Sequence, residues 1–215
     1  MKSKQIKIGM IGFGTVGSGV YKIIKENADI IKHQTGTEVI IEKILVRDIN
    51  KVRIVETAKD MLTTNPDEII NNPDIDIVVE VIGGEEPAYS YINTAIKNGK
   101  HIVTANKELI AKKGSYILDH ADRKGVSVGF EASVCGGIPI IRAFKSSLSA
   151  NRIGKIMGIV NGTTNYILTK MTKEGLDYEE ALKEAQEKGY AESDPTADVE
   201  GYDAMYKMAI LSSIG

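Results

Sequence analysis

Asp203 and Lys207 lie four residues apart in an apolar stretch near the end of the sequence. On an α-helix this spacing places both side chains on one face, about one turn from each other. A lysine ammonium is protonated at neutral pH and can give a proton to an oxygen that gains negative charge, while the carboxylate orients it. The alternative is a salt bridge on a helix surface, which contributes only about 0.3–0.5 kcal/mol. The spacing alone favours this alternative.

Three other side chains could take part in chemistry. Glu192 lies in an expected loop before the Asp203 helix and could accept a hydrogen bond from an amino group. Lys107 follows an expected strand directly, so it could contact a cofactor or a substrate carboxylate, or face water. Cys135 could be an acylating nucleophile like that of aldehyde dehydrogenases. No histidine lies near it in the sequence, however, and a lone buried cysteine is more often inert.

The start of the sequence predicts a turn that binds a dinucleotide. A bound nicotinamide would deliver hydride to a carbonyl carbon, and the carbonyl oxygen would then need a proton donor. An apolar run, residues 6–11, is followed by Gly12, Gly14 and Gly17 in the pattern GxGxxG. Such glycines allow a sharp turn, a close approach to a pyrophosphate and close packing of the next helix. The amphipathic segment that follows, residues 16–31, favours this interpretation over a turn that is merely tight.

Charged residues at the end of the second expected strand bear on the choice of cofactor. Residues 38–46 are rich in β-branched side chains and end in Arg47 and Asp48. At this place an acid accepts from the ribose 2′-hydroxyl of NAD, and an arginine accommodates the 2′-phosphate of NADP. Arg47 comes first and is followed by Lys51 and Arg53, so the sequence favours NADP without excluding NAD. The alternative is a solvated charged loop.

Strand and helix patterns alternate through the first 130 residues. Strands are expected at 6–11, 38–46, 74–82, 101–104 and 126–130, helices at 16–31, 88–97 and 108–112, and a short helix or loop at 61–72. This alternation predicts an α/β fold with a Rossmann-type, doubly wound parallel sheet. Ligands bind beyond the carboxyl ends of such strands. We therefore expect Gly83 and Thr104, at two strand ends, to border the cofactor.

The composition changes after Phe130, which predicts a dinucleotide-binding domain at 1–130 and a second domain at 131–215. In the second domain a Gly-rich crossing, 131–139, precedes an expected strand at 152–160 and several helices. Asp177 is expected to cap the helix that Gly189 ends. One or two strands are few for an independent sheet. We therefore expect an incomplete α+β substrate and dimerisation domain, and a fragment of a longer polypeptide.

The charge balance and the scarcity of cysteine exclude several classes of protein. With 27 Lys plus Arg against 29 Asp plus Glu the net charge is −2, so no nucleic-acid partner is expected. The apolar stretches fall short of the ~20 residues that span a bilayer, so no membrane is expected either. Cys135 is the only cysteine and the N-terminus lacks a signal-peptide pattern, which predicts a cytoplasmic protein. Scattered histidines argue against a zinc site.

Several motifs together resemble the homoserine dehydrogenases. They are GFGTVGSGV, VRD, VTANKELIA, FEASVCGGIPII, NGTTNYIL and GYAESDPTADVEGYDAMYKMAI. They extend over the whole chain, and the last is long and specific. The resemblance implies an oxidoreductase that interconverts L-aspartate 4-semialdehyde and L-homoserine with NAD(P)H, in threonine and methionine biosynthesis. It also implies a homodimer for the full-length protein.

The resemblance assigns roles to individual residues. It implies that Lys207 donates the proton, that Asp203 positions the substrate hydroxyl and water, and that Lys107 lies between nicotinamide and substrate. The substrate-binding residues that it implies are Glu192 for the amino group, Asp198, Gly162, Thr163 and Tyr190. The cofactor-binding residues are Ile11, Gly12, Phe13, Gly14, Thr15, Val16 and Gly17 at the pyrophosphate and Arg47 at the 2′-phosphate. A monovalent cation, usually sodium, would bind backbone carbonyls of Glu131, Val134, Gly136 and Ile138.

Two features depart from the family pattern. Cys135 stands where relatives commonly have glycine, which would alter the cation loop or add a redox-sensitive thiol. Family members also continue well beyond 215 residues, which leaves the activity of this chain open. Two other functions are therefore kept: a non-catalytic dinucleotide-binding module or inactive fragment, and an acylating semialdehyde dehydrogenase that uses Cys135.

Overall fold

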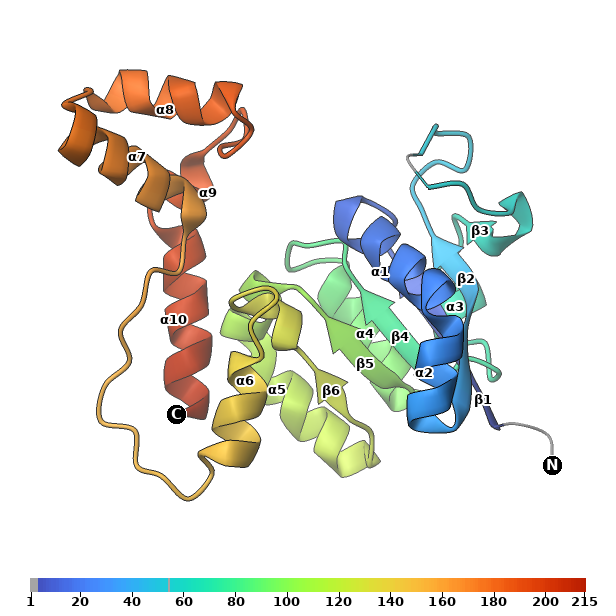
Figure 1. Cartoon of the computed structure of the whole chain (residues 1–215). Helices are drawn as coiled ribbons and strands as arrows, with labels where there is room; N and C mark the ends of the chain where they lie inside the picture. The colour runs from blue at the N-terminus through green and yellow to red at the C-terminus, as the bar shows by residue number, and fades with distance from the viewer. Residues whose placement is uncertain (1–3, 54) are drawn as a thin grey trace. The chain divides into compact units, whose positions relative to one another are not determined.

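The β-branched runs in the first part of the chain form one parallel sheet. The structure is a computed structural model that describes residues 4–53 and 55–215 (Figure 1). The strands are β1 (Lys4–Ile11), β2 (Thr37–Leu45), β3 (Leu62–Thr63), β4 (Ile77–Glu80), β5 (His101–Thr104) and β6 (Val128–Gly129). They are ordered β3-β2-β1-β4-β5-β6, and every neighbouring pair is parallel. The predicted α/β fold with a doubly wound sheet is therefore confirmed.

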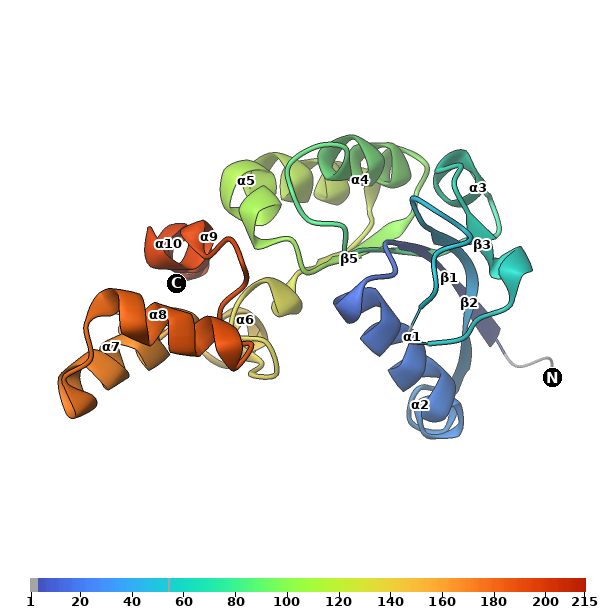
Figure 2. The same cartoon turned by 90° about the horizontal axis from the view of Figure 1, so that it is seen from above.

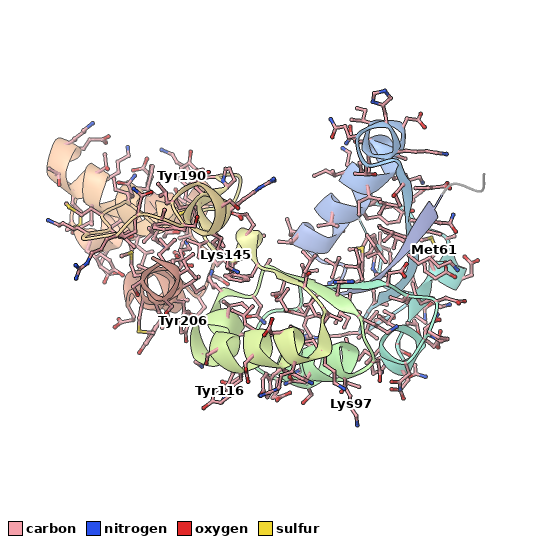
Figure 3. All side chains as sticks on the ribbon, turned by 90° about the horizontal axis from the view of Figure 1, so that it is seen from below. Met61, Lys97, Tyr116, Lys145, Tyr190 and Tyr206 are labelled. Atoms are coloured by element: carbon pink, nitrogen blue, oxygen red, sulfur yellow. The ribbon has the colours of Figure 1, made fainter. Side chains whose placement is uncertain are left out.

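Helices cover both faces of this sheet, as Figure 2 shows. One face carries α1 (Thr15–Glu26) and α2 (Ala28–Thr35), and the other carries α3 (Asp67–Ile70), α4 (Ala88–Lys97) and α5 (Lys107–Lys124). Lys97 and Tyr116 point away from the sheet on the outer side of the α4–α5 layer (Figure 3). The helix expected at 16–31 is two helices, and the one expected at 108–112 is much longer.

The central strand is buried on both faces, which explains its unbroken apolar run. Met10 and Ile11 are adjacent in β1 and are both fully buried, yet they belong to the cores of opposite faces. Successive side chains of a strand point to opposite faces, so a strand covered on both sides needs apolar residues at every position. The sequence of β1 therefore places it at the centre of the sheet.

The chain divides into two compact units, residues 1–133 and 134–215. The boundary expected near Phe130 lies close to this division. The second unit contains α6 (Ile140–Arg142), a π-helical turn (Ala143–Ser147), α7 (Gly162–Glu174), α8 (Tyr178–Glu187), α9 (Thr196–Val199) and α10 (Tyr202–Ile214). No helix in the described part of the chain is long and apolar enough to cross a membrane.

The prediction of a strand at 152–160 is wrong, and so is the prediction that the second unit is α+β. These residues are all described, and they form neither strand nor helix. A strand exists only where a neighbour accepts and donates its backbone hydrogen bonds, and the described residues of this unit supply none. Met157 and Ile159 are each 78% exposed as a result.

α7 and α8 form a helical hairpin with its own small core. Asp177 caps α8 as predicted, because its Oδ1 accepts from the Glu180 amide at 2.8 Å. Between the helices, the Lys188 ammonium, the Tyr166 hydroxyl and Lys170 lower the pKa of the Glu184 carboxyl to about 2. The hairpin is therefore joined by charge as well as by its buried alanines.

We expect Gly17→Ala to destabilise the fold by about 1–3 kcal/mol. A Cβ at Gly17 would lie 2.4 Å from the carbonyl oxygen of Gly12, and a backbone atom cannot yield as a side chain would. The matched control is Gly19→Ala in the same helix, where a Cβ meets nothing within 4 Å. Gly19→Ala should stabilise the protein by up to about 1 kcal/mol through helix propensity. Urea denaturation measures the free energy of unfolding of both variants. Equal changes in the two would contradict the close packing of Gly17.

Candidate functional site

The glycine turn has the backbone geometry that a pyrophosphate site requires. Gly12 has φ +109°, and a Cβ there would lie 2.9 Å from the carbonyl oxygen of Val81. Gly17 packs α1 against the Gly12 carbonyl, whereas Gly14 faces open space. No side chain in the described part of the chain caps the first turn of α1 at Gly14. The amides there are free to bind an anion, so the turn fits a dinucleotide phosphate.

A cavity of about 480 Å³ lies over this turn, at the carboxyl ends of the central strands. It is lined by Gly12, Phe13, Gly14, Leu45, Val46, Arg47, Asp48, Lys51, Arg53, Thr64, Val81, Ile82, Pro87 and Tyr91. The expected residues Gly12, Phe13, Gly14 and Arg47 are among them. Val81 and Ile82, which directly follow β4, were missed, although their place at a strand end next to β1 is a usable signal.

Among the described residues beyond β2, some of the charged side chains form hydrogen bonds within their own loop, and Arg47 does not. The guanidinium of Arg53 donates to the carbonyl oxygens of Asp48 and Lys51 and so holds the loop together. The Asp48 carboxylate accepts from the Asn50 amide at 2.8 Å. Arg47 is exposed, and its side chain has no hydrogen bond or ion pair within residues 4–53 and 55–215.

Other expected cofactor residues do not line this cavity. Thr104 is 1% exposed, and its hydroxyl donates to Glu80 and accepts from the Asn106 amide, so its side chain is already engaged. Gly83 has φ +71° in the turn after β4. Lys107 is the first residue of α5 and is half-buried. Ile11, Thr15, Val16 and Gly17 belong to the strand end and the helix start around the turn.

In the second unit the expected acid and lysine form a close, protected pair. The Lys207 ammonium donates to Asp203 Oδ2 at 2.6 Å and to the carbonyl oxygen of Val160 at 2.6 Å. The Asp203 side chain is 4% exposed and that of Lys207 18%. A salt bridge on a helix surface would leave both groups in water. The low exposure of this pair therefore argues against the interpretation as a surface salt bridge.

Asn161 connects this pair to α7, and the sequence reasoning missed it. Its Nδ2 donates to Asp203 Oδ2 at 2.9 Å and to Asp198 Oδ1 at 2.7 Å. Its Oδ1 accepts from the Thr164 amide at 2.8 Å and so caps α7. An asparagine just before a helix is a recognisable cap, but its contacts with two distant acids leave no local pattern. Asn161 therefore fixes Asp203 and the start of α7 together.

The expected substrate residues Thr163, Asp198 and Tyr190 meet at the same place. The Thr163 hydroxyl lies 2.8 Å from both Asp198 Oδ2 and the Tyr190 carbonyl oxygen. A cavity of about 450 Å³ adjoins them, lined by Gly162, Thr163, Asn165, Tyr166, Thr169 and Tyr190. Figure 3 shows Tyr190 beyond the end of α8.

Glu192 does not join this network. It is exposed in the loop after Tyr190, and its carboxylate makes no contact with another polar group of the described chain. Nearby, hydrogen bonds from the side chain and amide of Thr196 hold the pKa of the Asp194 carboxyl below its usual range. The loop is thus tied at Asp194, while Glu192 stays available.

The crossing loop has an unusual backbone at Cys135. Cys135 has φ +52°, in the left-handed region where a side chain costs about 1–2 kcal/mol, which is a physical reason for glycine there. Its carbonyl oxygen accepts from the Ile138 amide at 2.8 Å. Among the described residues no group of three or more His, Cys, Asp or Glu could hold a metal ion. A cation on the carbonyls of Glu131, Val134, Gly136 and Ile138 stays a prediction.

Comparisons with known proteins cover both units. Residues 12–131 match the family model "Homoserine dehydrogenase, NAD binding domain", and residues 139–215 match "Homoserine dehydrogenase". The homoserine dehydrogenase of Bacillus subtilis is 55% identical over 212 residues, which are 99% of this chain and 49% of that protein. The chain thus spans about half the length of the curated relatives it matches.

Solved structures agree with these matches. A homoserine dehydrogenase from Thiobacillus denitrificans superposes with a TM-score of 0.92 and 49% identity, over 98% of this chain and 48% of that one. A hyperthermophilic archaeal homoserine dehydrogenase in complex with NADPH gives 0.84 and 29%, over 98% and 69%. With a family model that covers more than half of its residues, this chain belongs to the homoserine dehydrogenase family.

Proposed function

We propose that this chain is part of an NAD(P)-dependent enzyme that interconverts L-aspartate 4-semialdehyde and L-homoserine. The observation that carries the proposal is the hydrogen-bonded network of Lys207 with the buried Asp203 and Asn161, in a chain that also contains a fitting dinucleotide turn. The family supports the same reaction. A cytoplasmic location and a homodimer remain expectations from the sequence and the resemblance.

Lys207 is the proposed proton donor. An ammonium has three donors, and the contacts with Asp203 and the Val160 carbonyl use two of them. The third is left for the oxygen of the substrate. The bound cofactor supplies the hydride. Asp203 orients the ammonium and balances its charge, and Asn161 keeps Asp203 in place.

Two acids that the resemblance groups together receive different tasks. Both carboxylate oxygens of Asp198 are engaged, one by Asn161 and the other by Thr163. Glu192 is exposed and unengaged in the described chain, so it suits the substrate's amino group. We assign amine binding to Glu192 and the support of α7 to Asp198.

Arg47 is the proposed reader of a 2′-phosphate. It lines the cavity at the end of β2 with its side chain unengaged, while Asp48 is used by its own turn. A guanidinium meets a phosphate with charge-assisted hydrogen bonds, and a carboxylate would repel it. NADP is therefore the preferred cofactor in this proposal.

A second candidate function is a non-catalytic dinucleotide-binding module. The match to only about half of each curated relative favours keeping it. Reduced nicotinamide absorbance distinguishes the two, measured with homoserine and NAD or NADP for this chain and for a version extended at its C-terminus. Cofactor binding without turnover in both would support the module. Turnover that requires phosphate and is lost in Cys135→Ser would instead support the acylating reaction.

We expect Lys207→Ala to lower kcat for semialdehyde reduction by about a hundredfold or more, since the carbonyl oxygen loses its proton donor. NADPH affinity, measured by fluorescence titration, should not change. The control is Lys183→Ala, which removes an exposed lysine from α8. Retained turnover in Lys207→Ala would contradict the assigned role.

Arg47→Ala should weaken NADPH binding by about tenfold or more, because a charge-assisted phosphate contact is lost. NADH, which lacks that phosphate, should bind much as before. Arg123→Ala removes an exposed arginine of α5 and serves as the matched control. An equal effect on both cofactors would show that Arg47 does not read the phosphate.

Asn161→Ala should lower the free energy of unfolding by about 2–4 kcal/mol, because α7 loses its cap and a buried carboxylate loses a donor. Asn165→Ala, on the same helix but exposed, should change it by less than about 0.5 kcal/mol. Denaturant titration of both variants distinguishes the loss of the Asn161 hydrogen bonds from the general effect of an alanine substitution at this helix. Equal stabilities would refute the bridging role.

A further inference from the structure

Glu80, the last residue of β4, is a fully buried carboxylate to which no role has been assigned so far. Its Oε1 accepts from the Ile82 amide at 2.9 Å and the Gly83 amide at 3.3 Å. Its Oε2 accepts from the Thr104 hydroxyl at 2.6 Å. Every contact is a donor aimed at the carboxylate, so the side chain acts as an acceptor at the junction of β4 and β5.

These contacts set the path of the chain after β4. Gly83 and Gly84 have φ +71° and +73°, so two successive residues turn in the left-handed region. Such a turn has little stability of its own because glycine is flexible. The Glu80 carboxylate fixes the start of the turn through the Ile82 and Gly83 amides.

Asn106 holds the other end of the same turn. Its Nδ2 donates to the Gly84 carbonyl oxygen at 2.7 Å, and its amide donates to the Thr104 hydroxyl at 3.0 Å. Glu80, the turn, Asn106 and Thr104 thus form a closed ring of hydrogen bonds between the ends of β4 and β5. Lys107 follows Asn106 directly and is positioned by the same ring.

The held segment is a wall of the dinucleotide cavity. Val81 and Ile82 line the cavity. A Cβ at Gly12 would lie 2.9 Å from both the Val81 carbonyl oxygen and Ile82 Cγ2, so the glycine turn packs directly against this wall. A shift of Ile82 would therefore change the site.

The wall faces the same cavity that the proposed reader of the 2′-phosphate lines. Arg47 and Asp48 line this cavity together with Val81 and Ile82. The ring, at the ends of β4 and β5, therefore supports the cavity from the other side of β1 than β2.

We propose that Glu80 is a positioning residue that holds this wall of the dinucleotide cavity through its contacts with Ile82, Gly83 and Thr104. The proposal rests on the proposed cofactor binding. It assigns control over the shape of the cavity to a buried acid that does not line the cavity itself.

The test compares two probes, NADPH and its adenosine fragment 2′,5′-ADP, by calorimetric titration of this chain and of Glu80→Gln. The Gln side chain keeps an acceptor for the amides but presents an amide group to the Thr104 hydroxyl, whose proton then loses its acceptor. We expect the affinities for NADPH and for 2′,5′-ADP both to fall by about tenfold, because the displaced wall lines the cavity that Arg47 also lines. No loss for either probe would overturn the proposal, as would an equal loss in a variant that lowers stability away from the ring.

A second variant keeps the test decisive if Glu80→Gln does not fold. Thr104→Val removes the same hydrogen bond and should show the same loss of affinity for both probes, and Thr104→Ser should restore the affinity. Ile117→Val, in the fully buried part of α5, lowers stability away from the ring and should bind both probes as the parent chain does. Should the parent chain not bind NADPH, the proposed function fails with this proposal. Binding by the parent and unchanged binding by the variants would overturn the role of Glu80 alone.

Discussion

Each unit contains a carboxylate that is almost removed from water, Glu80 in the first and Asp203 in the second. A buried carboxylate is costly unless donors surround it. Glu80 obtains them from two amides and a hydroxyl, and Asp203 from an ammonium and an amide group. One donor to each carboxylate, the Thr104 hydroxyl for Glu80 and the Asn161 amide group for Asp203, lies far away in the sequence. Each carboxylate is therefore fully satisfied only when that distant segment has reached its place.

The two carboxylates differ in what their donors can do. The donors around Glu80 are neutral and two of them belong to the backbone, so that site fixes geometry. Asp203 is paired with a lysine whose side chain is 18% exposed, which suits the proposed transfer of a proton to a ligand. The same cost of burial therefore produces a rigid wall in one unit and a positioned donor in the other.

The sequence predicts the features that depend on neighbours along the chain. The glycine turn, the apolar β1 and the Asp177 cap are each defined within a few residues, and the structure contains them. β3 is too short at two residues to leave a pattern. The expected strand at 152–160 has the right composition but no neighbour in the described chain. Glu80–Thr104 and Asn161–Asp203 join residues 24 and 42 positions apart, and such pairings cannot be read from one sequence.

The segment at the start of α7, residues 160–163, combines contacts that serve structure and the proposed chemistry together. Val160 offers its carbonyl to Lys207, Asn161 binds Asp203, and Thr163 approaches Asp198. Contacts with the lysine and both acids therefore come from three of the four residues 160–163. A displacement of this segment would move the ammonium, its counter-ion and the start of α7 in concert. A change at Asn161 would thus alter the proposed proton donor through its position.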